Sequence, residues 1–357
     1  MPSDTSPDPS LGRAGPATRE LSAWLDAIPK IELHLHLEGA IPHAALRELI
    51  AKYDGARAVP STAELDARFR YSTFREFLDA WMWKNGYLRQ LEDFTWIAQE
   101  VARDLARQNV VYAEVFCSPP DFEPLETQRL IEAIRLGFAR VPEIELALVP
   151  DLVRDYGPER GARELSEVAE VRALGVVGIG IGGTESAYPP QAFAGVYARA
   201  RQLGLRTTAH AGEVAGARSI WGALDVLQVD RIGHGTRAEE DPALLVALAE
   251  RRVPLEMCPI SNVCTGSIAS LGDHPIRRYF DRGLLVTVNT DDPGMFGNSL
   301  AQEYLRLIDD WGFTTDEIVS LVRNALEASW LTPSRRLELS ARLERGLRVP
   351  APGPSSE

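Results

Sequence analysis

Eight short runs rich in apolar and β-branched residues recur along the chain, and segments long enough to form a helix separate them. From the second run onward, consecutive runs start 22 to 34 residues apart. Before the second run, Phe94, Ala98 and Val101 recur at the spacing of one helical face. Apolar strands that each lead into a helix are typical of a parallel sheet covered by helices. The runs are Ile31–Leu37, Val110–Phe116, Ile144–Val149, Val176–Ile181, Arg206–Ala209, Arg231–Gly233, Val253–Met257 and Leu284–Asn289.

Eight strand–helix units predict an α/β fold of the (β/α)₈ TIM-barrel type. The alternative is an open, doubly wound sheet in which some of the runs are not strands. The first interval is longer than the others, which indicates a helical insertion after the first strand, at about residues 42–108. Such an insertion sits at the C-terminal mouth of a barrel, where active sites are built. Its aromatic segment Trp81–Tyr87 either packs against the barrel or forms a hydrophobic lid over the mouth.

Both ends of the chain have the composition of tails. Residues 1–18 are rich in Pro, Ser, Gly and Asp, so we expect a disordered N-terminal tail without the apolar core of a secretory signal. Residues 349–357 are rich in Pro and Ser and form a second expected tail. No long linker or charge run divides residues 19–348, which predicts a single barrel domain there.

The net charge of −13 argues against nucleic acid and against an anionic membrane surface as partners, because both need an excess of Lys and Arg. No apolar run approaches the length of about 18 residues that a membrane-spanning helix needs. The three cysteines, Cys117, Cys258 and Cys264, are too few for a disulfide framework, which favours a cytoplasmic protein. We expect buried structural roles for the last two, and surface or helix-capping roles for His43 and His274. Composition leaves the oligomeric state open.

Histidines end three of the runs. His34 and His36 lie at the end of the first run, and side chains at i and i+2 of a strand share one face. His210 ends the fifth run, and His234 ends the sixth between two glycines. Glycines on both sides leave backbone space around an imidazole, which packing alone hardly explains. In a barrel the C-terminal ends of these strands meet at one mouth.

Two adjacent acids, Asp291 and Asp292, follow the eighth run. Neighbouring side chains of a regular strand point to opposite faces, so one carboxylate can point inward while the other turns into the loop. A helix-capping or turn pair is the alternative for these acids. Together with His34, His36 and His210, one inward carboxylate makes a set of three nitrogens and one oxygen, which suits a divalent transition metal such as Zn²⁺.

Four short motifs carry a family resemblance. His-Leu-His-Leu-Glu-Gly, His-Ala-Gly-Glu, Gly-His-Gly and Asn-Thr-Asp-Asp-Pro, in this order, resemble the adenosine deaminase branch of the amidohydrolase superfamily. The likeness runs from about Pro29 to Leu331. It implies a barrel that replaces the 6-amino group of a small-molecule aminopurine by water and releases ammonia. The cytidine-deaminase zinc signature His-x-Glu…Pro-Cys-x-x-Cys is missing, which excludes that type.

The resemblance implies a catalytic centre with one Zn²⁺ per chain. Glu213 would protonate the purine ring nitrogen next to the attacked carbon, and His234 would orient and help deprotonate the metal-bound water. For this role Glu213 must be protonated, so we expect burial and the neighbouring Asp292 to raise its pKa. The implied zinc ligands are His34, His36, His210 and Asp291.

The resemblance also implies the contacts to the substrate. Asp292 would accept or share a hydrogen bond with the imidazole-ring nitrogen of the purine, the backbone N–H of Gly183 would meet another ring nitrogen, and Glu38 would face the part beyond the base. Adenosine-specific members carry Asp in place of Glu38 and Asp-Leu-Ala-Gly-Asp-Glu in place of Gly180–Glu185. A Glu at position 38 is similar to the residue at this place in the adenine deaminase branch. The Gly-Gly-Thr-Glu sequence, in contrast, is similar to that of members acting on aminodeoxyfutalosine. A catalytically silent purine-binding barrel is the non-enzymatic alternative.

Overall fold

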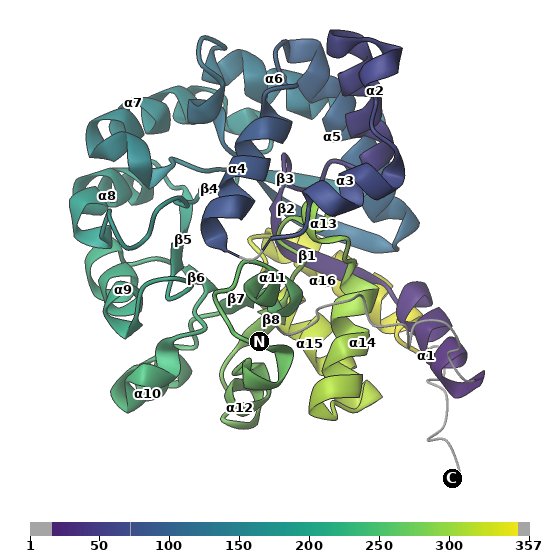
Figure 1. Cartoon of the computed structure of the whole chain (residues 1–357). Helices are drawn as coiled ribbons and strands as arrows, with labels where there is room; N and C mark the ends of the chain where they lie inside the picture. The colour runs from purple at the N-terminus through teal and green to yellow at the C-terminus, as the bar shows by residue number, and fades with distance from the viewer. Residues whose placement is uncertain (1–15, 72, 349–357) are drawn as a thin grey trace, which may run out of the picture.

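Eight parallel strands, each followed by helices, form the barrel in the computed structural model, which describes residues 16–71 and 73–348 (Figure 1). Each predicted run overlaps one strand, and every pairing between neighbouring strands is parallel. The predicted barrel is therefore confirmed. The strands are β1 (Lys30–His36), β2 (Val110–Cys117), β3 (Glu145–Pro150), β4 (Gly178–Ile179), β5 (Arg206–Ala211), β6 (Arg231–His234), β7 (Leu255–Met257) and β8 (Val286–Val288).

Isolated backbone bridges close the barrel between its two sheets. One sheet has the order β1-β2-β3 and the other the order β4-β5-β6-β7-β8. Bridges from Leu148 to Val176 and from Asp151 to Gly180 join β3 and the residue after it to residues on either side of β4. A bridge from Leu35 to Asp291 joins β1 to the segment after β8. Because the first and last strands meet, the sheet is not an open, doubly wound one.

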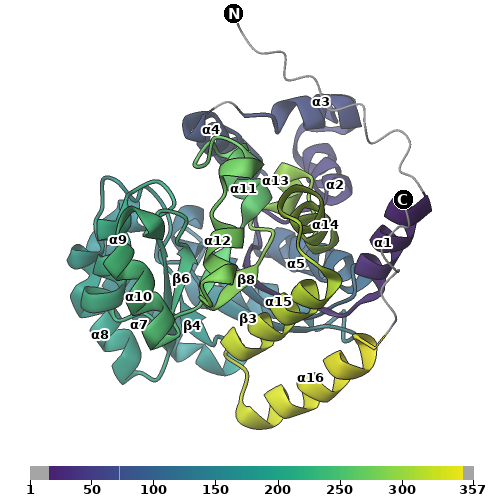
Figure 2. The same cartoon turned by 90° about the horizontal axis from the view of Figure 1, so that it is seen from below.

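Helices surround the strands, and the described residues of the long interval after β1 form four α-helices. Helices α3, α4 and α11 lie at one end of the barrel, and α16 lies at the other (Figure 2). Within the long interval, α5 packs against β2 and α6. The helices are α1 (Pro16–Ala27), α2 (His43–Asp54), α3 (Thr62–Arg68), α4 (Phe74–Asn85), α5 (Leu91–Arg107), α6 (Thr127–Phe138), α7 (Gly157–Glu170), α8 (Ala194–Gln202), α9 (Ala217–Trp221), α10 (Pro242–Arg251), α11 (Pro259–Cys264), α12 (Ile276–Asp281), α13 (Pro293–Phe296), α14 (Leu300–Trp311), α15 (Thr315–Ala328) and α16 (Pro333–Gly346).

Local sequence explains where several helices begin and which face they bury. Phe94, Ala98 and Val101 of α5 are buried, as their helical spacing predicts. The Thr314 hydroxyl accepts a hydrogen bond from the backbone N–H of Glu317, whose carboxylate accepts from the backbone N–H of Thr314, and this capping box starts α15. His43 opens α2, and its half-buried ring donates to the backbone carbonyl of Gly294 at 2.8 Å.

The expected tails lie almost wholly outside the described residues. Of the predicted tail at residues 1–18, residues 16–18 belong to α1, and the rest is not described. The second tail, residues 349–357, also lies outside the described part of the chain. Within residues 16–71 and 73–348, no helix is both long and apolar enough to cross a membrane.

Candidate active site

Three imidazoles and one carboxylate bring their donor atoms together at the C-terminal end of the strands. His210 Nε2 lies 3.1 Å from His34 Nε2 and 3.2 Å from His36 Nε2. Asp291 Oδ1 lies 3.5 Å and 3.4 Å from the same two nitrogens. Zinc–nitrogen bonds of about 2.0–2.1 Å in tetrahedral geometry place ligand atoms about 3.3 Å apart. The spacing and chemistry of this donor set therefore fit a zinc ion.

His34 is oriented by a buried carboxylate. Its Nδ1 lies 2.8 Å from Glu256 Oε2, which also accepts from the hydroxyl of Thr208. Arg231 donates to Glu256 through Nε at 2.5 Å and to Glu114 through a terminal nitrogen at 2.6 Å. A carboxylate that accepts from Nδ1–H leaves Nε2 unprotonated and directed at a metal. Our sequence reading missed this network, although Glu256 is a charged residue inside an apolar run.

His234 lies within the same cluster but differs from the three other imidazoles. Together with His34, His210 and Asp291 it forms a buried group whose candidate ligand atoms lie within 4.8 Å of one another. Its Nε2, however, lies 4.0 Å from Asp291 Oδ2 and 3.6 Å from Glu213 Oε2. Its Nδ1 lies 3.1 Å from the side-chain nitrogen of Asn262. This ring is therefore placed beside the donor set, facing Glu213.

The glycines on both sides of His234 stand where the backbone is crowded or left-handed. A Cβ atom at Gly233 would lie 3.0 Å from His34 Cε1 and 3.2 Å from His210 Cα. Gly235 adopts a φ of +70°, a left-handed conformation that favours glycine. Gly233 therefore lets β6 approach His34 on β1 and His210 on β5, whereas a side chain at Gly235 would meet Leu255 of β7.

The Glu213 carboxylate is buried next to the donor cluster. Burial first, and the negative charges of Asp291 and Glu185 next, raise its pKa to about 8. The predicted role of burial is confirmed, whereas Asp291 and Glu185, rather than the expected Asp292, are the main acidic contributors. Ser267 donates to Glu213 Oε1 at 3.4 Å. At neutral pH this group is therefore an acid that can give up a proton.

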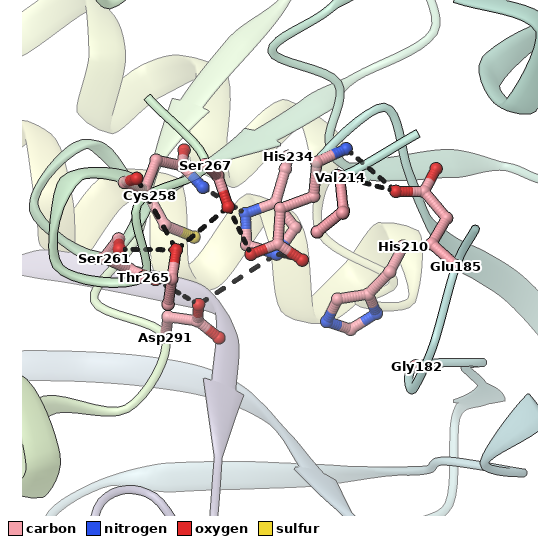
Figure 3. A network of polar contacts seen from close by, with 12 residues as sticks. Gly182, Glu185, His210, Val214, His234, Cys258, Ser261, Thr265, Ser267 and Asp291 are labelled. Carbon is pink, nitrogen blue, oxygen red and sulfur yellow. Dashed lines mark hydrogen bonds and ion pairs between the residues drawn. The ribbon is translucent and has the colours of Figure 1, made fainter. Parts of the chain in front are cut away.

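Glu185 holds the turn that carries Glu213. Its two carboxylate oxygens accept four backbone N–H groups, from residues 212–215, at 2.5–3.2 Å. Figure 3 shows the Glu185 carboxylate directed at Val214. A carboxylate that accepts hydrogen bonds from several consecutive backbone N–H groups holds the turn in one conformation, as an anion does when it is bound in a backbone nest. Glu185 was part of a motif in the sequence, but its role becomes visible only in the fold.

Asp291 and Asp292 both line the cavity, which corrects the expectation that one turns away. The regular strand β8 ends at Val288, and Asp291 has a φ of +65°, so the alternation of a strand does not apply. Ser261 donates to Asp291 Oδ2 at 2.6 Å. Burial, and next the charge of Asp291, raise the pKa of Asp292 well above its ordinary value. A Cβ atom at Gly39 would overlap the Asp292 carboxylate, so glycine is required there.

A cavity of about 730 Å³ opens above the donor cluster. Gly183 lines it with a φ of +94°, and a Cβ atom there would overlap the carboxylate of Asp155. Arg154 holds this loop from below by donating to the backbone carbonyls of Gly182 and His210. Part of the cavity wall is apolar and is formed by Phe77, Leu78, Trp81, Phe122 and Leu125.

The two predicted interpretations of the aromatic segment, packing against the barrel and covering its mouth, each fit some of its residues. Trp81 lines the cavity, with its ring edge-on to that of His36. Trp83 instead packs against α3, where the Arg68 guanidinium lies 3.8 Å from its ring centroid. Lys84 is buried and donates to the backbone carbonyl of Glu38 at 2.5 Å, which ties α4 to the loop after β1.

Glu38 does not line the cavity, although the sequence places it on the substrate side. It is fully buried, and Oε1 accepts from the backbone N–H of Ser118 at 3.0 Å. Its Oε2 has no partner among the described residues. Burial raises its pKa to about 7.

His274 is buried, so the surface position expected for it is wrong. It accepts a hydrogen bond from the backbone N–H of Ile276, the first residue of α12, but the N-cap of that helix is Pro275 and not His274. Cys258 is fully buried as expected, whereas Cys264 is only partly buried.

Comparisons with known proteins find relatives that match most of the chain. The family model described as adenosine deaminase matches residues 29–345. The aminodeoxyfutalosine deaminase of Streptomyces avermitilis is 34% identical over 91% of this chain and 93% of that enzyme. The adenine deaminase of Rhodospirillum rubrum is 34% identical over 90% of this chain and 97% of that enzyme. The crystal structure of an amidohydrolase from Burkholderia ambifaria with bound Zn superposes with a TM-score of 0.84 at 29% identity and covers 94% of both chains.

Proposed function

The chain belongs to the adenosine deaminase family of hydrolases acting on C–N bonds of aminopurine-type substrates, and on that premise we propose that it is a zinc-dependent deaminase of a 6-aminopurine nucleoside. The reaction replaces the 6-amino group by the oxygen of water and releases ammonia. The observation that carries the proposal is the convergence of four metal-donor atoms beside a buried acid that is protonated at neutral pH.

We assign one zinc ion per chain to the donor set. Bound Zn²⁺ supplies a water-derived nucleophile at neutral pH, because it lowers the pKa of water from about 15.7 to about 7. Glu256 holds His34 in the tautomer that ligation needs. Ser261 orients Asp291 from the other side. The proposed ligands are His34, His36, His210 and Asp291.

Glu213 acts as the general acid in this proposal. An aromatic purine resists attack at carbon 6 unless electron density can move onto the adjacent ring nitrogen. A protonated carboxyl group that donates its proton to that nitrogen allows electron density to move there. General acid catalysis of this kind raises the rate by about 10²–10⁴-fold. His234 faces Glu213 at 3.6 Å and orients the attacking water.

Two groups of the cavity wall recognise the base in this proposal. The side chain of Asp292 contacts the imidazole-ring nitrogen of the purine, where its raised pKa allows it to donate a hydrogen bond. The backbone N–H of Gly183 contacts a second ring nitrogen. Glu38 acts on the substrate side from beneath the wall, through the loop after β1, which Lys84 of α4 holds by donating to the Glu38 carbonyl.

The size of the cavity favours a purine with a substituent over the bare base. Its volume of about 730 Å³ lies in the upper half of the range of about 300–1,000 Å³ for small-molecule sites. Adenine deaminase activity is the second candidate, because an enzyme of that name is as similar to the chain as the aminodeoxyfutalosine enzyme. Because the metal donors, Glu213 and His234 are all in place, a catalytically silent purine-binding barrel is disfavoured.

An ammonia-release screen tests the proposal. Adenosine, deoxyadenosine, methylthioadenosine, aminodeoxyfutalosine and adenine are each supplied to the zinc-loaded chain, and kcat/KM is measured. We expect the highest value for a nucleoside and a loss of about 10²–10⁴-fold in Glu213→Gln with zinc retained. A best value for adenine selects the second candidate. No ammonia from any of the five compounds, or full activity in Glu213→Gln, contradicts the proposal.

A further inference from the structure

A chain of buried side chains leads from the start of α12 to His234. The backbone nitrogen of Ile276 lies 3.3 Å from His274 Nδ1. His274 Nε2 lies 3.2 Å from Asn262 Oδ1. The side-chain nitrogen of Asn262 lies 3.1 Å from His234 Nδ1. His234, Asn262 and His274 are each at most 1% exposed, so water does not compete for these contacts.

The first member of this chain fixes the direction of every other hydrogen bond. A backbone N–H can only donate, so His274 Nδ1 accepts from Ile276. Burial keeps the His274 ring neutral and lowers its pKa to about 3. A neutral ring that accepts at Nδ1 carries its hydrogen on Nε2, and it therefore donates to the Asn262 carbonyl. The amide then presents its N–H group to His234 Nδ1, which must accept, and the hydrogen of His234 is left on Nε2.

We propose that His274 is a positioning residue that fixes the tautomer of His234 through Asn262, so that His234 presents an N–H donor to the active site. The Nε2 atom of His234 lies 3.6 Å from Glu213 Oε2 and 4.0 Å from Asp291 Oδ2. A donor at this place orients an oxygen nucleophile between these groups. In the resting enzyme His234 therefore holds the nucleophile and does not take its proton, unlike the role that the family resemblance implies.

The hydrogen-bonding capacity of Asn262 offers a sharp test. Asn262→Asp keeps the shape of the side chain but turns the donor that faces His234 into an acceptor. The His234 ring must then donate through Nδ1, which moves its hydrogen away from Nε2. His274→Phe keeps the ring volume and removes the donor to Asn262, so the amide is free to rotate and both tautomers of His234 become populated.

Nitrogen NMR of the ¹⁵N-histidine-labelled, zinc-loaded chain reads the tautomer directly, with His234→Gln used to assign the signals. We expect a pyrrole-type signal at Nε2 in the unmodified chain, at Nδ1 in Asn262→Asp, and a mixture in His274→Phe. The matched control is His43→Phe, which changes a histidine outside the site and leaves the His234 signals in place. A pyrrole-type Nδ1 in the unmodified chain, or unchanged His234 signals in both variants, overturns the proposal.

Kinetics supply the second readout, which rests on the proposed function. We expect kcat to fall by about tenfold or more in Asn262→Asp while KM changes by less than about threefold and zinc content is kept, because an interaction with the nucleophile is lost and not one with the purine. A full kcat in a variant whose tautomer has changed contradicts the assigned role of the donor. If the unmodified chain deaminates no aminopurine, the proposed function fails, whereas the NMR result still decides the positioning role.

Discussion

His34 Nδ1 lies 2.8 Å from Glu256 Oε2, and both side chains are fully buried. The carboxylate is in turn held by Arg231, which also reaches Glu114 on β2. The guanidinium of Arg231 stacks at 3.6 Å on the ring of Trp330, which follows α15. Through these contacts the orientation of His34, a candidate metal ligand, is linked to Glu114 on β2 and to Trp330 after α15.

Replacing Glu256 by Gln should weaken zinc binding. The variant exchanges a charged acceptor for a neutral amide and leaves Arg231 with one carboxylate fewer. Removal of such a partner costs about 10–100-fold in metal affinity. Competition with a chromogenic chelator measures this loss. Glu164→Gln is the matched control, because Glu164 is an equally buried carboxylate that accepts from Thr127 on the outer helices, and equal zinc affinities in the two variants would contradict the prediction.

Replacing Glu185 by Gln should lower kcat more than it raises KM. An amide accepts through one oxygen only, so its nitrogen faces backbone N–H groups of residues 212–215 that the carboxylate now satisfies. Unsatisfied buried donors cost about 1–3 kcal/mol, and the turn that carries Glu213 should loosen. Hydrogen exchange of a peptide spanning these residues should speed up. Glu240→Gln, at a half-exposed carboxylate that accepts from the backbone of Ala217, is the control, and unchanged exchange in Glu185→Gln would count against the prediction.

Replacing Lys84 by Met should raise KM and destabilise the fold. The ammonium group donates to the Glu38 carbonyl and to the side-chain oxygen of Asn85. Methionine retains the apolar stem but leaves a buried carbonyl without its donor, at a cost of about 1–3 kcal/mol. Urea unfolding and substrate-dependence curves measure the two effects. Lys52→Met removes a half-exposed partner of Asp93, and a larger effect in that variant would contradict the role given to Lys84.

The Arg277–Glu317 ion pair between α12 and α15 should make stability depend on pH in the acidic range. Hydrogen bonds from Arg277 lower the pKa of Glu317 from 4.5 to about 2. Because the folded state favours the ionised carboxylate, this stabilisation is complete above about pH 5 and is lost as the pH falls towards about 2.

Arg277→Gln tests this pH dependence. The pair is partly exposed, so we expect the variant to lose only about 0.2–1 kcal/mol at pH 7. The difference from the unmodified chain should vanish as the pH falls towards 2, as denaturant unfolding at several pH values will measure. Arg75→Gln, in a fully exposed pair with Asp79, should have no effect at any pH. A difference that stays constant down to pH 2 would show that packing of Arg277, and not its charge, stabilises the contact.

Much of the fold, and the residues of the candidate metal site, follow from sequence pattern alone. Apolar runs at near-regular spacing predict the eight parallel strands, because a strand buried on both faces needs apolar residues along its length. The i, i+2 spacing of His34 and His36 places both rings on one face, and their ring centroids lie 5.4 Å apart. Glycines on both sides of His234 predict backbone space around its ring, and a Cβ atom at Gly233 would indeed crowd His34 and His210. These are local properties, which the order of residues determines directly.

Only the tertiary structure decides what surrounds those donors. Glu256 and His34 are 222 residues apart in the chain, and Glu185 and the turn that it holds are separated by a whole helix. His274 looked like a surface residue because a histidine before proline in a loop carries no sign of burial. Asp291 departs from strand geometry because the barrel closes there through a bridge to Leu35. Burial, tautomer and raised pKa arise from groups that meet only when the barrel closes, so no local pattern can specify them.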